Sequence, residues 1–244
     1  MKIGIVFLFA VLILGAGSSV PGVRAASTIY VDLWVAYDEE FQSTAQSFYG
    51  YSPQTLAHII IDSAFYYFCD VFDVYYRIST YSFWDSDDSL TDSDPRLDEC
   101  MDELGWLSGC HEGVEFLVAF TDQESLGWYG TSDRLLGAVL VTETYKGGVG
   151  QATDNVLQHE LSHLYGAQNH EVQNLTCVMN YYRYWIGFPH LYYVPTALVT
   201  NSWCDNCTEL IASHREDWGT GSGGGGGGGW EPPRMVPYGG GSSG

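Results

Sequence analysis

The sequence predicts a domain of the α/β (α+β) class, in which strands and helices alternate along one chain. Three stretches indicate it. Residues 28–37 alternate apolar and polar side chains, as a strand does. Residues 52–72 and 153–164 instead repeat apolar side chains every three to four positions, as helices do. Roughly 200 residues lie between the two ends of the chain, enough for one well-filled domain.

The remaining elements follow in order along that domain. Ser52 and Pro53 are a typical helix start, and Leu56, Ile60, Ala64 and Phe68 share one helical face. Thr153 or Asp154 can cap the next helix, in which Leu157, Leu161 and Leu164 form the core face. We expect further strands at 74–79, 113–121 and 135–142 and a terminal helix at 208–218.

The two ends of the chain differ from the domain. Residues 1–25 carry Lys2, an apolar run from Ile3 to Leu14 and small residues before Ala25, which predicts a signal peptide cleaved after Ala25 or Ala26. No other stretch looks long enough to cross a membrane. Residues 219–244 are Gly-rich and are expected to be disordered. The domain is therefore predicted at 26–218, in a secreted, soluble and monomeric protein.

Charge excludes two classes of partner. The formal net charge is −21, with 9 basic and 30 acidic residues. Such a chain repels nucleic acid and anionic membranes, so neither is expected to bind. Residues Asp85–Asp94 (DSDDSLTDSD) concentrate the acidic side chains. Ca²⁺ is a candidate ligand there, but the spacing does not match an EF-hand, and a solvated loop is favoured.

Residues 159–163 carry the chemistry. His159 and His163 are four apart, so on a helix both imidazoles project from one face and can bind one Zn²⁺ at about 2.0–2.1 Å. Glu160 lies beside them as a general base for a metal-activated water. Gly166 can end the helix in the left-handed conformation and turn the chain back. A third ligand then comes from Asn169 or His170.

This stretch resembles the zinc signature of the metzincin clan of metalloproteases, His-Glu-x-x-His-x-x-Gly-x-x-His/Asp. The run Cys177-Val178-Met179-Asn180-Tyr181 resembles the clan's Met-turn, with Met179 below the metal and Tyr181 as an oxyanion donor. The resemblance implies a zincin fold: a twisted, mainly parallel sheet of four to five strands, an active-site helix and a C-terminal helix. It also implies a peptide or protein substrate.

The third-ligand position departs from the clan, because Asn169 stands where His or Asp is usual. In a subset resembling snapalysin-type enzymes the run is Gly-x-x-Asp-His, which would make Asn169 a neutral substitute for Asp. A shift of one residue would instead bring in the nitrogen of His170. The sequence leaves both open. The resemblance further implies that the edge strand of the sheet comes just before the zinc helix and binds substrate, at Gly137, Ala138, Val139 and Leu140.

Six cysteines follow the signal peptide: Cys69, Cys100, Cys110, Cys177, Cys204 and Cys207. In an exported protein they predict up to three disulfides, with Cys100–Cys110 and a bridge from Cys177 to Cys204 or Cys207 as candidates. The competing hypothesis follows a similarity to archaemetzincins, which hold a second, structural zinc on four cysteines. Here it would be a mixed site of His170, Cys177, Cys204 and Cys207. Disulfides are favoured.

The predicted function is a secreted zinc endopeptidase. Glu160 is the general base, and Tyr181 supports the oxyanion. The principal alternative is a non-catalytic secreted peptide-binding protein whose weakened third ligand no longer holds zinc, which Asn169 supports. An aminopeptidase is a lesser alternative.

Overall fold

The computed structural model describes residues 27–108, 113–123, 129–142, 153–170, 177–180, 183–186, 192–195 and 200–221. The side chains of 183–186, 192–195 and 220–221 are not described. The predicted signal peptide (1–25) and the tail from residue 222 onward lie outside the described residues.

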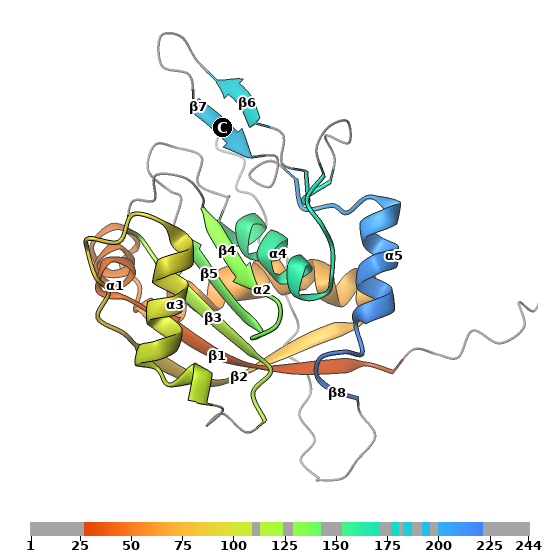
Figure 1. Cartoon of the computed structure of the whole chain (residues 1–244), viewed down its shortest axis with the longest axis horizontal. Helices are drawn as coiled ribbons and strands as arrows, with labels where there is room; N and C mark the ends of the chain where they lie inside the picture. The colour runs from red at the N-terminus through yellow and green to blue at the C-terminus, as the bar shows by residue number, and fades with distance from the viewer. Residues whose placement is uncertain are drawn as a thin grey trace, which may run out of the picture.

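A six-stranded sheet forms the centre of the molecule (Figure 1). Its order is β2-β1-β3-β5-β4, with β8 paired to β1. The β1–β2, β1–β3 and β3–β5 pairs are parallel, whereas β4 runs antiparallel to β5 and β8 antiparallel to β1. The predicted mixed α/β fold with a mainly parallel sheet is confirmed. The strands are β1 (Ile29–Tyr37), β2 (Val74–Phe83), β3 (Phe116–Thr121), β4 (Gly130–Asp133), β5 (Ala138–Thr142) and β8 (Thr220–Gly221).

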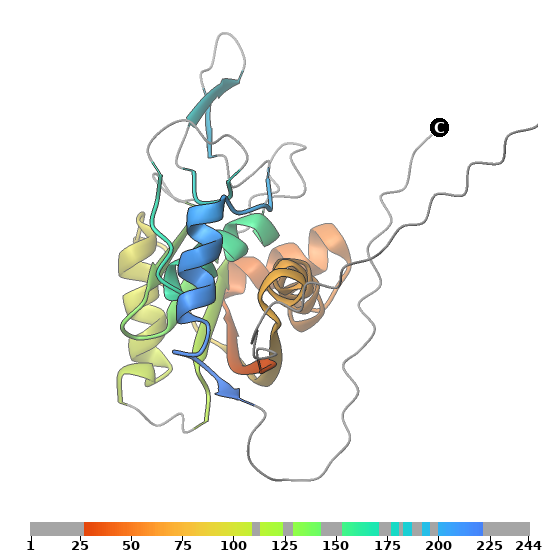
Figure 2. The ribbon, with the colours of Figure 1, turned by 90° about the vertical axis from the view of Figure 1, so that its right-hand side faces the viewer.

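Helices cover both faces of this sheet (Figure 2). α2 and α4 pack against one face, and α3 packs against the other. A separate hairpin of β6 (Arg183–Ile186) and β7 (Tyr192–Pro195) forms a second sheet. The helices are α1 (Glu39–Thr44), the π-helical turn η1 (Ala45–Tyr49), α2 (Pro53–Phe72), α3 (Ser93–Glu103), the 3-10 turn η2 (Trp106–Ser108), α4 (Thr153–Leu164) and α5 (Asp205–His214).

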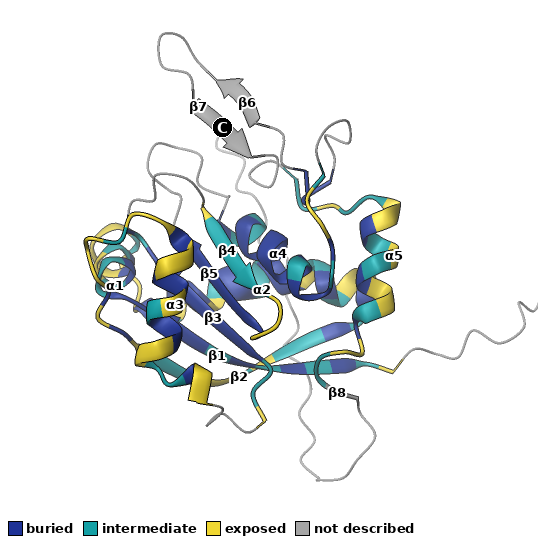
Figure 3. Ribbon diagram, in the orientation of Figure 1, coloured by how far each residue is buried: buried dark blue, intermediate teal, exposed yellow. Residues whose placement is uncertain are grey.

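The core follows the strand alternation. In β3, Phe116, Val118 and Phe120 face α2 and α4, while Leu117 and Ala119 face α3. All six residues of β3 and all five of β5 are buried, as Figure 3 shows. Burying one such large apolar side chain contributes about 1.5–3 kcal/mol. This double-sided packing fixes the sheet on which the site is built.

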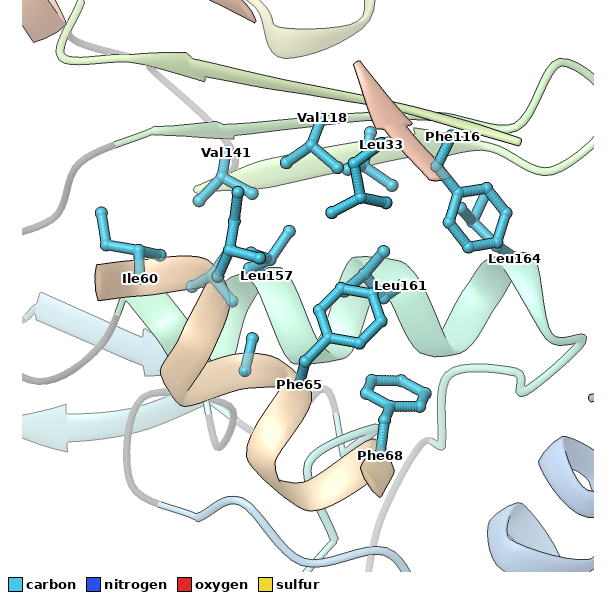
Figure 4. Close-up of a cluster of buried hydrophobic side chains, with 14 of the residues drawn as sticks. Leu33, Ile60, Phe65, Phe68, Phe116, Val118, Val141, Leu157, Leu161 and Leu164 are labelled. Atoms are coloured by element: carbon cyan, nitrogen blue, oxygen red, sulfur yellow. The ribbon is translucent and has the colours of Figure 1, made fainter. Parts of the chain in front are cut away.

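The predicted face of α2 is buried. Ser52 caps the helix by accepting the Thr55 N–H at 3.1 Å, and Pro53 occupies its first turn. By length and composition α2 also meets the criterion for a membrane span, contrary to the expectation that no stretch beyond the signal does. Its Phe65 and Phe68 pack with α4 beneath the sheet (Figure 4), as a core helix does.

The end of the domain differs from its prediction. The last helix, α5, begins at Asp205 and ends at His214, earlier than the expected 208–218. Residues Thr220–Gly221, assigned to the disordered tail, instead pair with β1 as β8. Gly219 makes this possible: its φ is 88°, and a Cβ there would lie 2.4 Å from the Tyr30 carbonyl oxygen.

Candidate metal centres and active site

His159 and His163 lie one turn apart on α4, and their rings converge. The two Nε2 atoms are 3.1 Å apart, and the ring planes are at 83°. His159 is buried and His163 half-buried. The opposite face of α4 is held in the core by buried side chains, namely Leu157, Leu161 and Leu164 (Figure 4).

A backbone carbonyl orients each ring. His159 Nδ1 lies 2.8 Å from the Val178 oxygen, and His163 Nδ1 lies 2.8 Å from the Ala167 oxygen. A carbonyl only accepts, so each Nδ1 carries the proton and each Nε2 presents a lone pair. Desolvation lowers the pKa of both imidazoles, which favours this neutral form.

Two lone pairs that face each other at 3.1 Å repel unless a cation lies between them. Neighbouring ligands of a tetrahedral Zn²⁺ at 2.0–2.1 Å are separated by about 3.3 Å. The spacing and the tautomers therefore fit a zinc ion held by both Nε2 atoms.

The chain turns back after α4 and brings Asn169 to the imidazoles. Gly166 has φ 87°, as the sequence predicts for the helix end, and its N–H donates to the His163 oxygen at 2.9 Å. The Asn169 side chain then hydrogen bonds to both His159 and His163, which opposes but does not cancel the lowering of their pKa by desolvation. Asn169 is thus the third polar group of this centre.

His170, the other candidate for third ligand, faces away from the imidazole pair. Its Nε2 lies 2.9 Å from Cys207 Sγ and 3.3 Å from Cys204 Sγ. Of the two alternatives left open by the sequence, the structure places Asn169, rather than His170, beside His159 and His163.

The predicted Met-turn lies under the same rings. The Asn180 N–H donates to the Cys177 oxygen at 3.0 Å, which closes a tight turn, and Met179 at its tip is fully buried. Val178 in this turn supplies the carbonyl that orients His159. Tyr181, the predicted oxyanion donor, lies outside the described residues.

Glu160 is buried beside the first imidazole and is held from above by β4. Ser132 Oγ donates to Glu160 Oε2 at 2.9 Å. Desolvation raises the Glu160 pKa, while His163 and the Ser132 hydrogen bond lower it. Gly130 allows this close approach, because a Cβ there would lie 2.9 Å from Glu160 Cγ. Nothing in the sequence singled out Ser132, which is 28 residues away and reaches Glu160 only through the β4–β5 pairing.

Comparison with protein families agrees with this geometry. A model described as Metallo-peptidase family M12 matches residues 27–208, which include all the residues placed above. The chain belongs to metallopeptidase family M12. A zinc-dependent peptidase chemistry follows from that membership and from the histidine pair. No curated protein matches this M12 metallopeptidase.

Several solved structures are similar to the M12 chain. A chain in a chaperone–substrate complex has a TM-score of 0.53 and 9% identity over 78% of this chain; the match covers 34% of that chain, about a third of its length. Archaemetzincin from Methanopyrus kandleri has a TM-score of 0.47 and 14% sequence identity, and the match covers 77% of this chain and 96% of that one. A zinc-dependent peptidase from Methanocorpusculum labreanum has a TM-score of 0.46 and 12% sequence identity, and the match covers 73% of this chain and 99% of that one.

The substrate strand of the metallopeptidase needs correction. Ala138, Val139 and Leu140 lie in β5, between β3 and β4, and Gly137 is in the turn before it. Both edges of β5 are already paired, so the prediction that this is the edge strand is wrong. The edge strand beside β5 is β4, which apolar spacing does not reveal because its residues, GTSD, are few and polar.

A second group of ligands lies next to the first centre. His170, Cys177, Cys204 and Cys207 place their Nε2 and Sγ atoms within 4.8 Å of one another. Cys177 Sγ and Cys207 Sγ are 3.9 Å apart. Sulfur ligands of a tetrahedral Zn²⁺ at 2.3 Å are separated by about 3.8 Å. Three thiols and one imidazole at these spacings fit a closed, structural zinc site.

The favoured disulfide is not formed here. Cys177, Cys204 and Cys207 are free thiols, and 3.9 Å is far beyond the bond length of about 2.05 Å. The thiol of Cys207 and neighbouring N–H groups lower the pKa of the Cys177 thiol, the direction that a metal ligand requires. Cys100 is free and buried, and its predicted partner Cys110 lies outside the described residues.

Proposed function

We propose that this metallopeptidase is a secreted zinc endopeptidase that uses Glu160 as general base. The observation that carries the proposal is the pair of Nε2 lone pairs 3.1 Å apart with a buried carboxylate on the adjacent residue. Secretion rests on the signal-like residues 1–25. His159, His163 and the Asn169 amide oxygen would hold the metal.

Zinc, when bound, lowers the pKa of a water ligand to about 7 and polarises a carbonyl. Glu160 is placed to take a proton from the attacking water and to deliver it to the leaving amine. Its raised pKa suits the second role, because a weaker acid more readily holds the proton that it must deliver. Tyr181 is proposed as a donor to the oxyanion, two residues beyond Met179.

The edge of β4 is proposed to bind the substrate main chain. β4 is the last strand of the sheet order, and Ser132 on it contacts Glu160. A peptide that adds to β4 as an extended strand would pass directly over the catalytic carboxylate. Main-chain pairing is independent of side-chain identity, which supports cleavage within a chain rather than at a free terminus.

The His170–Cys177–Cys204–Cys207 group is proposed as a structural zinc site. His170 directly follows Asn169, and Cys177 directly precedes Val178, which orients His159. A metal there would therefore hold both supports of the catalytic centre in place.

The non-catalytic alternative rests on Asn169, since a neutral amide is a weaker zinc ligand than His or Asp. The test is zinc content together with casein cleavage, with and without a chelator. We expect two zinc ions per chain and chelator-sensitive cleavage. One zinc ion per chain, held by the thiol group alone, together with no cleavage would favour the peptide-binding alternative.

Glu160→Ala isolates the base. We expect cleavage to fall by about 10²–10⁴-fold while both zinc ions remain, because the carboxylate moves a proton but does not hold the metal. Glu209→Gln, on the exposed side of α5, is the matched control and should cleave normally. Wild-type activity in Glu160→Ala would exclude this role.

A further inference from the structure

Three carboxylates gather at the carboxyl ends of the parallel strands, away from both zinc candidates. Glu39 and Glu40 follow β1 and begin α1, and Asp88 lies in the loop after β2. Their oxygens lie within 4.8 Å of one another. Neighbouring parallel strands end at the same edge of a sheet, where ligands of open α/β folds bind.

A buried amide after the third strand points to a ligand at this cluster. Gln123 follows β3 and is only 9% exposed, and its Nε2 donates to Asp88 Oδ1 at 3.2 Å. The oxygen of the same amide, Oε1, is buried without a hydrogen-bond partner. A buried amide oxygen left unpaired costs about 1–3 kcal/mol, and a cation beside Asp88 would give it a partner.

The carboxylates of the cluster repel one another. The carboxyl groups of Glu40 and Asp88 are within hydrogen-bonding contact, and burial together with Glu39 raises the pKa of Glu40. Arg96, the neighbouring cation in the described part of the chain, interacts electrostatically with Glu40, and its guanidinium also donates to the carbonyls of Leu90 and Gln123. Like charges in contact need either a shared proton or a positive ion between them.

We propose that Glu39, Glu40, Asp88 and Gln123 bind one Ca²⁺ that fastens the acidic loop to α1. The donors are all oxygens, which hard cations prefer and which argue against zinc. Ligands on opposite sides of Ca²⁺ at 2.3–2.6 Å lie about 4.6–5.2 Å apart, which matches the observed span. Glu39 and Glu40 are half-buried and Asp88 is exposed, so water can complete the six to eight ligands.

The site joins three segments, namely the start of α1, the loop after β2 and the residues that follow β3. Ser86, two residues before Asp88 in the loop, already donates its N–H to Glu39 Oε2 at 3.1 Å and its hydroxyl to Glu40 Oε2 at 3.1 Å. The loop then leads into α3, whose Asp94 accepts a hydrogen bond from Thr131 of β4. Ca²⁺ would therefore fix the start of the helix that covers this face of the sheet.

Calorimetric titration of the zinc-loaded mature protein with CaCl₂ tests the site. We expect one ion per chain with Kd about 10⁻⁴–10⁻³ M, the range of exposed extracellular sites, and a Tm that rises with CaCl₂. MgCl₂ should bind at least tenfold more weakly, because three carboxylates and an amide do not form its strict octahedron. Absence of binding up to 20 mM CaCl₂, roughly twentyfold above that Kd range, would overturn the proposal.

A double variant and a charge-matched control separate the site from general screening. Glu40→Gln with Asp88→Asn should raise Kd at least tenfold and abolish the rise in Tm. Asp98→Asn with Glu209→Gln removes the same charge from exposed positions and should respond as wild type. Gln123→Met keeps the shape without the oxygen and should weaken binding severalfold. Equal responses from the double variant and the control would overturn the site.

Discussion

Asn169 and His170 are neighbours in the chain but face two different centres. Asn169 hydrogen bonds to His159 and His163, two ligands on one helix, while His170 contacts Cys204 and Cys207. The first centre is local, because four residues separate its two imidazoles. The second is assembled from residues up to 37 positions apart, since Cys207 comes from α5.

This difference assigns different consequences to the two metals. Hydrogen bonds to Val178 and Ala167 orient the imidazoles, and buried leucines anchor α4 in the core, so we expect α4 to form without its metal. The thiol centre instead joins the Met-turn to α5, with Cys177 in one and Cys207 in the other. Loss of the first metal should stop chemistry, and loss of the second should weaken the fold.

The largest expected effect breaks the second centre. Cys207→Ser should remove one of two zinc ions and lower the free energy of unfolding by more than about 4 kcal/mol, since a metal cross-link is lost. Cys69→Ser, outside both centres, is the control. Zinc analysis and urea unfolding measure both effects. Unchanged zinc content in Cys207→Ser would contradict the assignment of the thiol centre.

The second-largest effect is expected from replacing Asn169, the third polar group of the first centre. Asn169→Asp should tighten zinc there about tenfold, because a carboxylate binds the ion more strongly than an amide. His170→Asn, one residue on, should mainly weaken the thiol centre and change the zinc affinity of the first centre much less. Competition with a chromogenic chelator measures both affinities. Equal effects of the two substitutions on the catalytic site would mean that the centres do not divide between these neighbours.

Acid should act on the first centre through its histidines. Burial lowers the pKa of His159 and His163 in the folded, metal-free protein, so the unfolded chain takes up protons first as pH falls below about 6.5. The stability contributed by neutral imidazoles is present above that pH and is lost as pH falls toward the folded pKa. In EDTA, His163→Gln should show a shallower loss of Tm between pH 7 and 5 than wild type. If His163→Gln and wild type lose Tm equally over this range, histidine burial is not the cause of the acid sensitivity.

The smallest effect concerns the hydroxyl above Glu160. Ser132→Ala removes one hydrogen bond, worth about 1 kcal/mol, so kcat should fall about fivefold with little change in KM. Because that bond lowers the Glu160 pKa, the acidic limb of the rate profile should move to higher pH. Thr131→Val, at the preceding residue of β4, should leave the acidic limb of the rate profile in place. An unshifted limb in Ser132→Ala would leave Ser132 without this positioning role.

The parts of the site that the sequence predicted are those with local periodicity. His159, Glu160 and His163 lie within five residues, so helical geometry alone brings the two rings together. Gly166 and Met179 were identified through similar short-range patterns, and the order of strands and helices followed from apolar spacing. Secretion and the role of Tyr181 stay predictions.

The remaining parts depend on contacts that spacing does not encode. Ser132 reaches Glu160 only because β4 folds back on β5, and the motif offers no signal for it. A disulfide was predicted in place of the thiol centre, because cysteines of an exported chain usually form bridges. In the structure His170 lies among the three thiols. The sequence could not decide whether Asn169 or His170 is the third ligand, because the answer depends on the direction of the turn after Gly166.

Buried Arg215 joins the two ends of the domain. Its guanidinium donates to the carbonyl of Phe72 at 2.6 Å and to that of Ser27 at 3.0 Å. Ser27 lies two residues before β1, so Arg215 ties the start of the sheet to the segment that follows α5. During synthesis the segment before β1 therefore lacks this anchor until Arg215, beyond the end of α5, has been added to the chain.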